Sequence, residues 1–238
     1  MSSLLWVIIS TSIAGLAMPL GGLIARFEHF QSNWLEDEFR HGVMAFGGGA
    51  LLSAIGLVLV PESIQHVSIP LASLYFLAGS FAFMCLDIWL RKTNTPASQL
   101  AAMLADFIPE SIALGASIAL NNGTSLLLAA LITLQNIPEG FNAFRELHKA
   151  PKFGTLKILL VFTGLALLGP IAGIIGFIWL TKYHHAVAAI MLFASGGILY
   201  SIFQDIAPQV KLEKHWFPPM GAVFGFLLGL VGFMLVHK

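Results

Sequence analysis

Long runs of apolar residues, separated by short polar connections, recur along this chain of 238 residues. Each run is about twenty residues long, which lets an α-helix cross the hydrocarbon core of a membrane. A transmembrane β-barrel would instead show short segments in which apolar and polar positions alternate. The connections leave no room for a separate soluble domain, so residues 1–238 are expected to form a single transmembrane domain. The pattern predicts an all-α membrane protein with eight transmembrane helices, at about 3–25, 40–61, 69–90, 99–121, 124–145, 155–180, 186–209 and 217–237.

The overall composition supports lipid as the main solvent of this chain. It is 57% hydrophobic and only 10% charged, whereas a soluble domain carries about 25% charged residues. The formal net charge is zero, so electrostatics gives no reason to expect a nucleic-acid partner. A single cysteine, Cys85, excludes both an internal disulfide and a metal site built from several cysteines.

Basic residues are distributed unevenly between the two sides of the expected bundle. Lys182 and Lys238 fall on one side, and the other ten fall on the opposite side. Such an excess marks the cytoplasmic side of a membrane protein. We therefore expect both termini outside the cytoplasm, in an integral multi-pass protein of the plasma (inner) membrane. The ten residues on the cytoplasmic side are Arg26, Arg40, Arg91, Lys92, Arg145, Lys149, Lys152, Lys157, Lys211 and Lys214.

Several acidic residues fall inside or at the edge of the apolar runs. Asp87 lies one helical turn before Arg91, which predicts an interfacial ion pair. No lysine or arginine falls within the interior of any expected helix, and an ionised carboxylate there costs several kcal/mol unless it is paired. The partner of the other acids is therefore expected to be a cation or a proton. These acids are Glu62, Asp106, Glu110, Glu139 and Asp205.

Two similar Ile-Pro-Glu stretches lie in the expected fourth and fifth helices, within 106–117 and 134–144. If these helices form an antiparallel hairpin, Glu110 lies near the midplane and faces Gln135. Asp106 and Glu139 then face each other one turn nearer the cytoplasm. Each pair on one helix is spaced i, i+4, so all four oxygen-bearing side chains can converge.

The two prolines fit a polar interior at this depth. Pro109 and Pro138 cannot donate a hydrogen bond to the carbonyls of Ala105 and Leu134. In a membrane such freed carbonyls need partners, and broken helices of this kind line the cation sites of many transporters. The alternative is a packing kink whose glutamate is protonated and hydrogen-bonded across the bundle.

These motifs resemble the ZIP family of divalent metal transporters. The chain reads Asp-Phe-Ile-Pro-Glu-Ser at 106–111 and Gln-Asn-Ile-Pro-Glu-Gly at 135–140, and the stretches 46–63, 163–176 and 193–208 are also similar to spans of that family. The resemblance implies a ZIP-like bundle with proline-kinked spans four and five and outward termini. It further implies one transport domain that moves zinc, manganese, iron or cadmium ions into the cytoplasm.

The departures from the family pattern are informative. Asp106 stands where the family has histidine, Phe107 where it has asparagine, and Asn136 where many members have aspartate. Gly169 replaces the glutamate that usually precedes the proline of the sixth span. Because phenylalanine and glycine side chains cannot ligate a metal, the resemblance implies a version with one metal site rather than two.

The resulting metal-ligand set contains only oxygen donors. Such a set suits Mn²⁺, Mg²⁺, Ca²⁺ or Fe²⁺ better than zinc, which favours imidazole and thiolate but accepts carboxylates. Three carboxylates around one divalent ion leave a surplus negative charge, so we expect one of them to take up a proton. Proton exchange would then accompany transport. No resident cofactor is expected, and the metal is the substrate. The expected ligands are Asp106, Glu110, Gln135 and Glu139, with Asn136 as a further candidate.

Three other functions are alternatives to divalent-metal transport. An intramembrane metalloenzyme is disfavoured, because His-Glu-x-x-His is absent and no histidine accompanies the buried acids. The chain is therefore not expected to be an enzyme. A degenerate ZIP-like protein that serves as a sensor or structural subunit is supported by Phe107 and Gly169. A pathway for protons or monovalent cations is the third alternative. A homodimer is left open, and divalent metal ions and the lipid bilayer are the expected partners.

The eight histidines avoid the middle of every expected helix. His184 and His185 fall in a loop expected to face outward and could assist metal capture. Ordinary interfacial histidines are the plainer interpretation of the pair.

Overall fold

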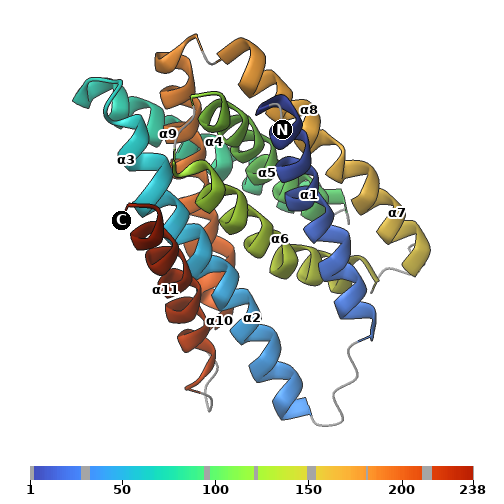
Figure 1. Ribbon diagram of the computed structural model, residues 1–238. Coiled ribbons are helices and arrows are strands. Elements are labelled where there is room, and N and C mark those ends of the chain that lie inside the picture. The colour runs from blue at the N-terminus through green and yellow to red at the C-terminus, as the bar shows by residue number, and fades with distance from the viewer. Residues whose placement is uncertain are drawn as a thin grey trace.

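A computed structural model describes residues 3–27, 33–93, 97–120, 123–148, 154–180, 182–210 and 216–237. Within these ranges the chain is helical and contains no strand, which confirms an all-α protein (Figure 1). The longer helices are α1 (Ser3–Phe27), α2 (Asn33–Ala54), α4 (Ile69–Thr93), α5 (Ala97–Ala119), α6 (Ser125–His148), α7 (Thr155–Ala166), α8 (Leu168–Ile175), α9 (His184–Ser201) and α11 (Pro218–Val236).

Six helical stretches in the described part of the chain are long and apolar enough to cross a membrane. This finding supports a multi-pass membrane protein. The stretches are Ser3–Phe27, Glu38–Ser63, Ile69–Lys92, Thr155–Trp179, His184–Ile206 and Pro218–Val236. The expected fourth and fifth spans correspond to α5 and α6, which have 23 and 24 residues but are not among the six. Both helices carry polar side chains in their middle.

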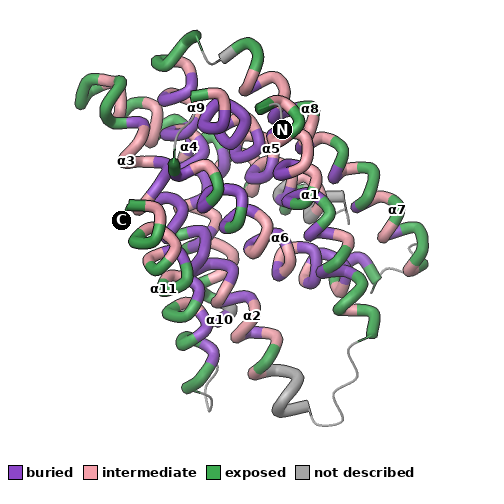
Figure 2. Tube along the Cα trace, in the orientation of Figure 1, coloured by how far each residue is buried: buried purple, intermediate pink, exposed green. Residues whose placement is uncertain are grey.

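Helices α5 and α6, which carry these polar side chains, are surrounded by the other helices. Helix α6 contacts α1, α2 and α5, and α5 also contacts α8 and α9. Figure 2 shows mostly buried residues along α5 and α6, while α7 and α11 present exposed residues on the outside. The arrangement places polar groups in the centre and apolar side chains toward the surrounding lipid, as a membrane bundle requires.

Helices α1 and α6 approach each other so closely that only glycine fits at their crossing. A Cβ atom on Gly140 would overlap the carbonyl oxygen of Met18, and one on Gly21 would overlap the carbonyl oxygen of Ile137. Both obstacles are backbone atoms, which cannot rotate away. Gly140 directly follows Glu139, so this crossing fixes the position of the second Ile-Pro-Glu stretch against α1.

Two helices contain a π-helical turn that ends two residues before a proline, Pro61 in one case and Pro208 in the other. Helix α2 continues through η1 (Ile55–Leu59) into α3 (Val60–Ser63), and α9 continues through η3 (Ile202–Ile206) into α10 (Ala207–Val210). Val60 donates its backbone N–H to Ile55, and Ala207 donates its N–H to Ile202. These bonds span five residues instead of four, and such turns are frequent at functional sites. A third π-helical turn, η2 (Gly176–Leu180), follows α8.

Candidate functional site

A hydrogen-bonded pair of polar side chains lies at the centre of the bundle. The Nε2 atom of Gln135 is 2.7 Å from both carboxyl oxygens of Glu110, and it donates to them. Glu110 is 1% exposed and Gln135 is 0% exposed. The pairing agrees with the facing positions predicted for these two residues from their expected depth. The contact joins α5 to α6 and removes both groups from solvent.

Four buried oxygen atoms around this pair have no hydrogen-bond donor within the described residues. They are Asp106 Oδ1, Gln135 Oε1, Asn136 Oδ1 and Glu139 Oε2. Buried polar atoms are almost always hydrogen-bonded, and each exception calls for a physical explanation. All four are acceptors, so the group they lack is a proton donor or a cation. Every predicted metal ligand except Glu110 supplies one of these oxygens.

Asn136 also has a structural contact. Its Nδ2 atom donates to the carbonyl oxygen of Ala14 at 2.8 Å, which ties α6 to α1. The side chain is fully buried. Because the Nδ2 atom is used in this hydrogen bond, only the Oδ1 atom of Asn136 remains for a ligand.

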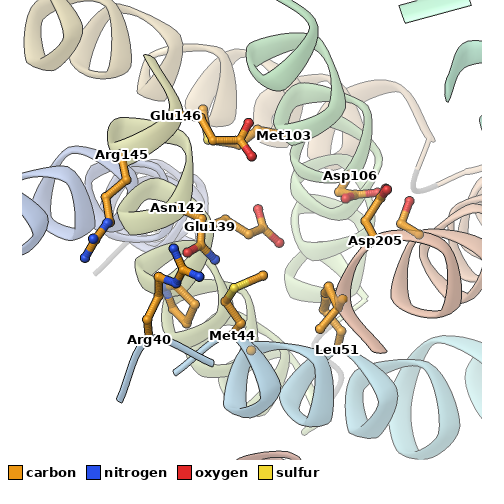
Figure 3. Close-up of a pocket in the computed structure, with 14 residues that line it drawn as sticks. Arg40, Met44, Leu51, Met103, Asp106, Glu139, Asn142, Arg145, Glu146 and Asp205 are labelled. Atoms are coloured by element: carbon orange, nitrogen blue, oxygen red, sulfur yellow. The ribbon is translucent and has the colours of Figure 1, made fainter. Parts of the chain in front are cut away.

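A cavity of about 310 Å³, here called the first cavity, reaches the predicted site from one end of the bundle. Figure 3 shows Asp106, Glu139 and Asp205 directed into the same space. Glu110 is not among the lining residues, so the Glu110–Gln135 pair lies beyond the inner end of this cavity. The polar and charged lining residues are Arg40, Asp106, Glu139, Asn142, Arg145, Glu146, Ser201 and Asp205.

Part of this lining was not anticipated from the sequence. Asn142 and Glu146 follow Glu139 by three and seven residues, which places all three on one face of α6. This spacing would have allowed Asn142 and Glu146 to be predicted from the sequence as neighbours of Glu139. Arg40, by contrast, comes from α2, and only the packing of α2 against α6 brings it to the cavity.

A row of polar residues on α5 leads from the first cavity to a second one. Asp106, Glu110 and Ser117 follow one another at spacings of four and seven residues and share a face of the helix. Asp106 lines the first cavity, and Ser117 lines a cavity of about 340 Å³ further along α5, here called the histidine cavity. Glu110 therefore lies between two cavities that approach it from opposite ends.

Phe107 and Gly169 contact each other, although they are far apart in the sequence. Phe107 is fully buried. A Cβ atom at Gly169 would lie 2.5 Å from Phe107 Cζ and 2.9 Å from the carbonyl oxygen of Thr11. The large ring thus occupies space that is open only because residue 169 is glycine. The side chains of residues 107 and 169 are therefore sterically complementary.

This complementarity predicts a coupled effect on stability. Gly169→Ala should destabilise the protein by about 1–3 kcal/mol, the usual cost of overpacking. The same change should cost less in a Phe107→Leu background, because one of the two obstacles is then removed. The rescue should be partial, since the Thr11 carbonyl remains. A double-mutant cycle of unfolding free energies in detergent micelles measures this coupling, and strictly additive values would contradict it.

The acids at the edges of the bundle have protein partners. Asp87 and Arg91 form the predicted ion pair at 2.9 Å, and Arg91 also contacts Asp205 at 3.2 Å. The expectation that Asp205 needs a partner from outside the chain was therefore wrong, because folding brings α4 beside η3. Glu62 likewise accepts a hydrogen bond from Thr124.

The predicted ligands do not form a closed coordination shell. Within the described residues, no group of three or more His, Cys, Asp or Glu side chains is arranged so that it could hold a metal ion. Asp106, Glu110 and Glu139 are neighbours along two helix faces, with amide oxygens between them. The role of these residues and of Asn136 as metal ligands therefore stays a prediction. Such an arrangement can offer several oxygen acceptors to a cation that passes through.

Comparison with known proteins adds no assignment to these observations. No protein-family model matches this chain, and a search of curated proteins found no match.

Proposed function

We propose that this protein transports divalent metal cations across the membrane, through the oxygen-rich site on α5 and α6. The observation that carries the proposal is the set of four buried acceptor oxygens without donors, on Asp106, Gln135, Asn136 and Glu139. A cation that passes along the two helices would meet these oxygens in turn, whereas a structural role would leave them unexplained. The proposal involves no bond-breaking chemistry and no resident cofactor.

The position of this site between two cavities supports movement rather than storage. The first cavity gives access to Asp106 and Glu139, and the histidine cavity lies on the other side of Glu110. The Glu110–Gln135 contact closes the path between them in this conformation. A transporter needs such a closure, because a continuous opening would let ions and water leak. Opening requires Gln135 to leave Glu110, whose carboxylate then becomes available to the ion.

The topology belongs to the same proposal. We propose that α5 and α6 cross the membrane as the fourth and fifth of eight spans, with the prolines within them. The excess of basic residues on one side then places the first cavity toward the cytoplasm of a plasma (inner) membrane, with both termini outside. In this orientation the ZIP-like direction of transport is inward, and a proton exchanged at the carboxylates accompanies the metal.

Uptake into proteoliposomes tests the proposal. The purified protein is compared with Glu110→Gln for uptake of Zn²⁺, Mn²⁺, Fe²⁺ and Cd²⁺. We expect saturable uptake in the wild type and a reduction of at least about tenfold in the variant, because an amide removes the charge of the central carboxylate. Glu38→Gln is the matched control: Glu38 lies on α2 and lines neither of the two cavities. Its uptake should be unchanged. Equal uptake by wild type and Glu110→Gln would contradict the proposal.

A second candidate is a ZIP-like protein that no longer transports. The Phe107–Gly169 contact favours it, because a phenylalanine and a glycine stand where the ZIP pattern has side chains that can ligate a metal. This candidate predicts that Glu110→Gln together with Glu139→Gln leaves cellular metal content unchanged. A proton or monovalent-cation pathway would instead dissipate a pH gradient while none of the four metals is taken up.

A further inference from the structure

The histidine cavity carries a second group of metal-binding side chains. It has a volume of about 340 Å³ and lies at the end of the bundle opposite the first cavity. Its lining combines one carboxylate, three hydroxyl groups, one side-chain amide and three imidazoles, which is a different donor set from the all-oxygen site. The residues that supply these groups are Glu62, Ser63, Ser117, Thr124, Gln65, His66, His184 and His237.

Two of the imidazoles lie face to face. The ring centroids of His66 and His184 are 5.3 Å apart, and the ring planes differ by 26°. His66 follows α3, whereas His184 is the first residue of α9, and α3 packs against α9. Both side chains are exposed at the cavity mouth. Neither imidazole hydrogen-bonds to another described side chain or backbone group, so the ring nitrogens are available to a ligand.

A buried serine continues the polar surface from this mouth toward the centre. Ser117 is 3% exposed and lines the cavity, and its Oγ atom has no hydrogen-bond partner within the described residues. It lies seven residues beyond Glu110 on α5, a distance of about 10 Å along the helix axis. An ion or its hydration water at the cavity floor would satisfy this hydroxyl. The histidine pair and Ser117 thus mark successive depths of one cavity.

We propose that His66 and His184 bind a divalent cation of the borderline class, such as Zn²⁺, at the mouth of the histidine cavity. Imidazole nitrogen is a preferred ligand of these ions. With two protein ligands and water in the remaining positions, the site binds weakly and reversibly. That is the property required of a capture site, because an ion that is held tightly does not move on. Cation binding by His66 and His184 does not depend on whether the protein transports ions. The role of this pair as the site that an ion reaches first rests on the proposed function.

The two sites select ions by different ligand chemistry, and an ion that enters through the histidine cavity meets them one after the other. The outer imidazoles favour ions that accept nitrogen, while the inner carboxylates and amides favour ions that accept oxygen. Zn²⁺ and Mn²⁺ satisfy both sites to different degrees. Ca²⁺ and Mg²⁺ prefer oxygen ligands and gain little from the imidazoles, so the pair discriminates against the most abundant divalent ions before they reach Glu110.

Calorimetric titration of the full chain in detergent micelles with Zn²⁺ tests the proposal. The titration uses a Glu110→Gln, Glu139→Gln background, in which the central site is weakened. We expect residual Zn²⁺ binding there, and we expect His66→Gln or His184→Gln to weaken it by at least about tenfold. The matched control is His185→Gln, which changes the adjacent exposed histidine outside the cavity lining. Thermal unfolding of each variant verifies that the fold is retained.

The outcomes separate this proposal from the proposed function. Unchanged binding in both His66→Gln and His184→Gln would overturn the histidine site, whatever the transport assay shows. Equal weakening in His185→Gln would also overturn it, because binding would then belong to exposed histidines in general. In proteoliposomes, His66→Gln should raise the Zn²⁺ concentration for half-maximal uptake and leave the maximal rate unchanged. Loss of uptake in Glu110→Gln with outer Zn²⁺ binding retained supports both proposals.

Discussion

Replacing Gln135 by leucine is expected to destabilise the bundle by about 1–3 kcal/mol, the cost of leaving a buried polar partner without its hydrogen bond. The Nε2 atom of Gln135 is the donor to both carboxyl oxygens of Glu110. Its loss leaves a carboxyl group, 1% exposed, without that donor. Unfolding in detergent micelles, followed by helical circular dichroism, measures the change in free energy.

A double replacement provides the control for this prediction. When Gln135 and Glu110 are both replaced by leucine, no polar group of the pair is left without its partner. The double variant should therefore be more stable than Gln135→Leu alone. It should nevertheless show no metal uptake, since the central carboxylate is gone. A double variant less stable than Gln135→Leu would contradict the prediction. It would indicate that interactions other than the Glu110–Gln135 contact stabilise Glu110 in the folded protein.

Gly140→Ala is expected to have an equally large effect, through sterics rather than polarity. The added methyl group would overlap the carbonyl oxygen of Met18, so α1 and α6 must separate. Overpacking of this kind costs about 1–3 kcal/mol, and more where the obstacle is backbone. Because Glu139 precedes this glycine, the displacement should also reduce metal uptake. Thermal unfolding and proteoliposome uptake measure the two effects.

Gly164→Ala on α7 is the matched comparison. Gly164 is exposed, and a Cβ atom there meets nothing within 4 Å. The same substitution should then be neutral or stabilise the protein by up to about 1 kcal/mol, as alanine does in a helix interior. Opposite signs for Gly140→Ala and Gly164→Ala are expected. Similar values for both would show that helix propensity, not the α1–α6 crossing, governs the response.

The features that could be predicted from the sequence are those set by local periodicity. Helix α1 (Ser3–Phe27) agrees closely with the expected span 3–25, and α6 (Ser125–His148) with 124–145. The Glu110–Gln135 contact was also predictable, because a short hairpin fixes the relative depth of its two helices. For these elements the neighbouring residues in the chain carry the necessary information.

The features that could not be predicted depend on contacts between distant segments. Arg91 and Asp205 are 114 residues apart, and only the packing of α4 near η3 brings them together. The Phe107–Gly169 contact and the stacking of His66 on His184 likewise join segments that are far apart in the chain. Nothing in local spacing encodes such pairs. Pro109 and Pro138 indicated altered backbone hydrogen bonding, but the π-helical turns lie in other helices, near Pro61 and Pro208.

These π-helical turns set the rotational register of the segments that follow them. A π-helical turn amounts to one extra residue inserted into an α-helix, and one residue rotates a helix by about 100°. The π-helical turn absorbs that residue, so Glu62 on α3 keeps the orientation in which it meets Thr124 at the histidine cavity. A further residue inserted into Ile55–Leu59 would not be absorbed and would turn α3 by about 100°. Glu62 would then leave Thr124, and one added residue would be enough to move the carboxylate away from that cavity.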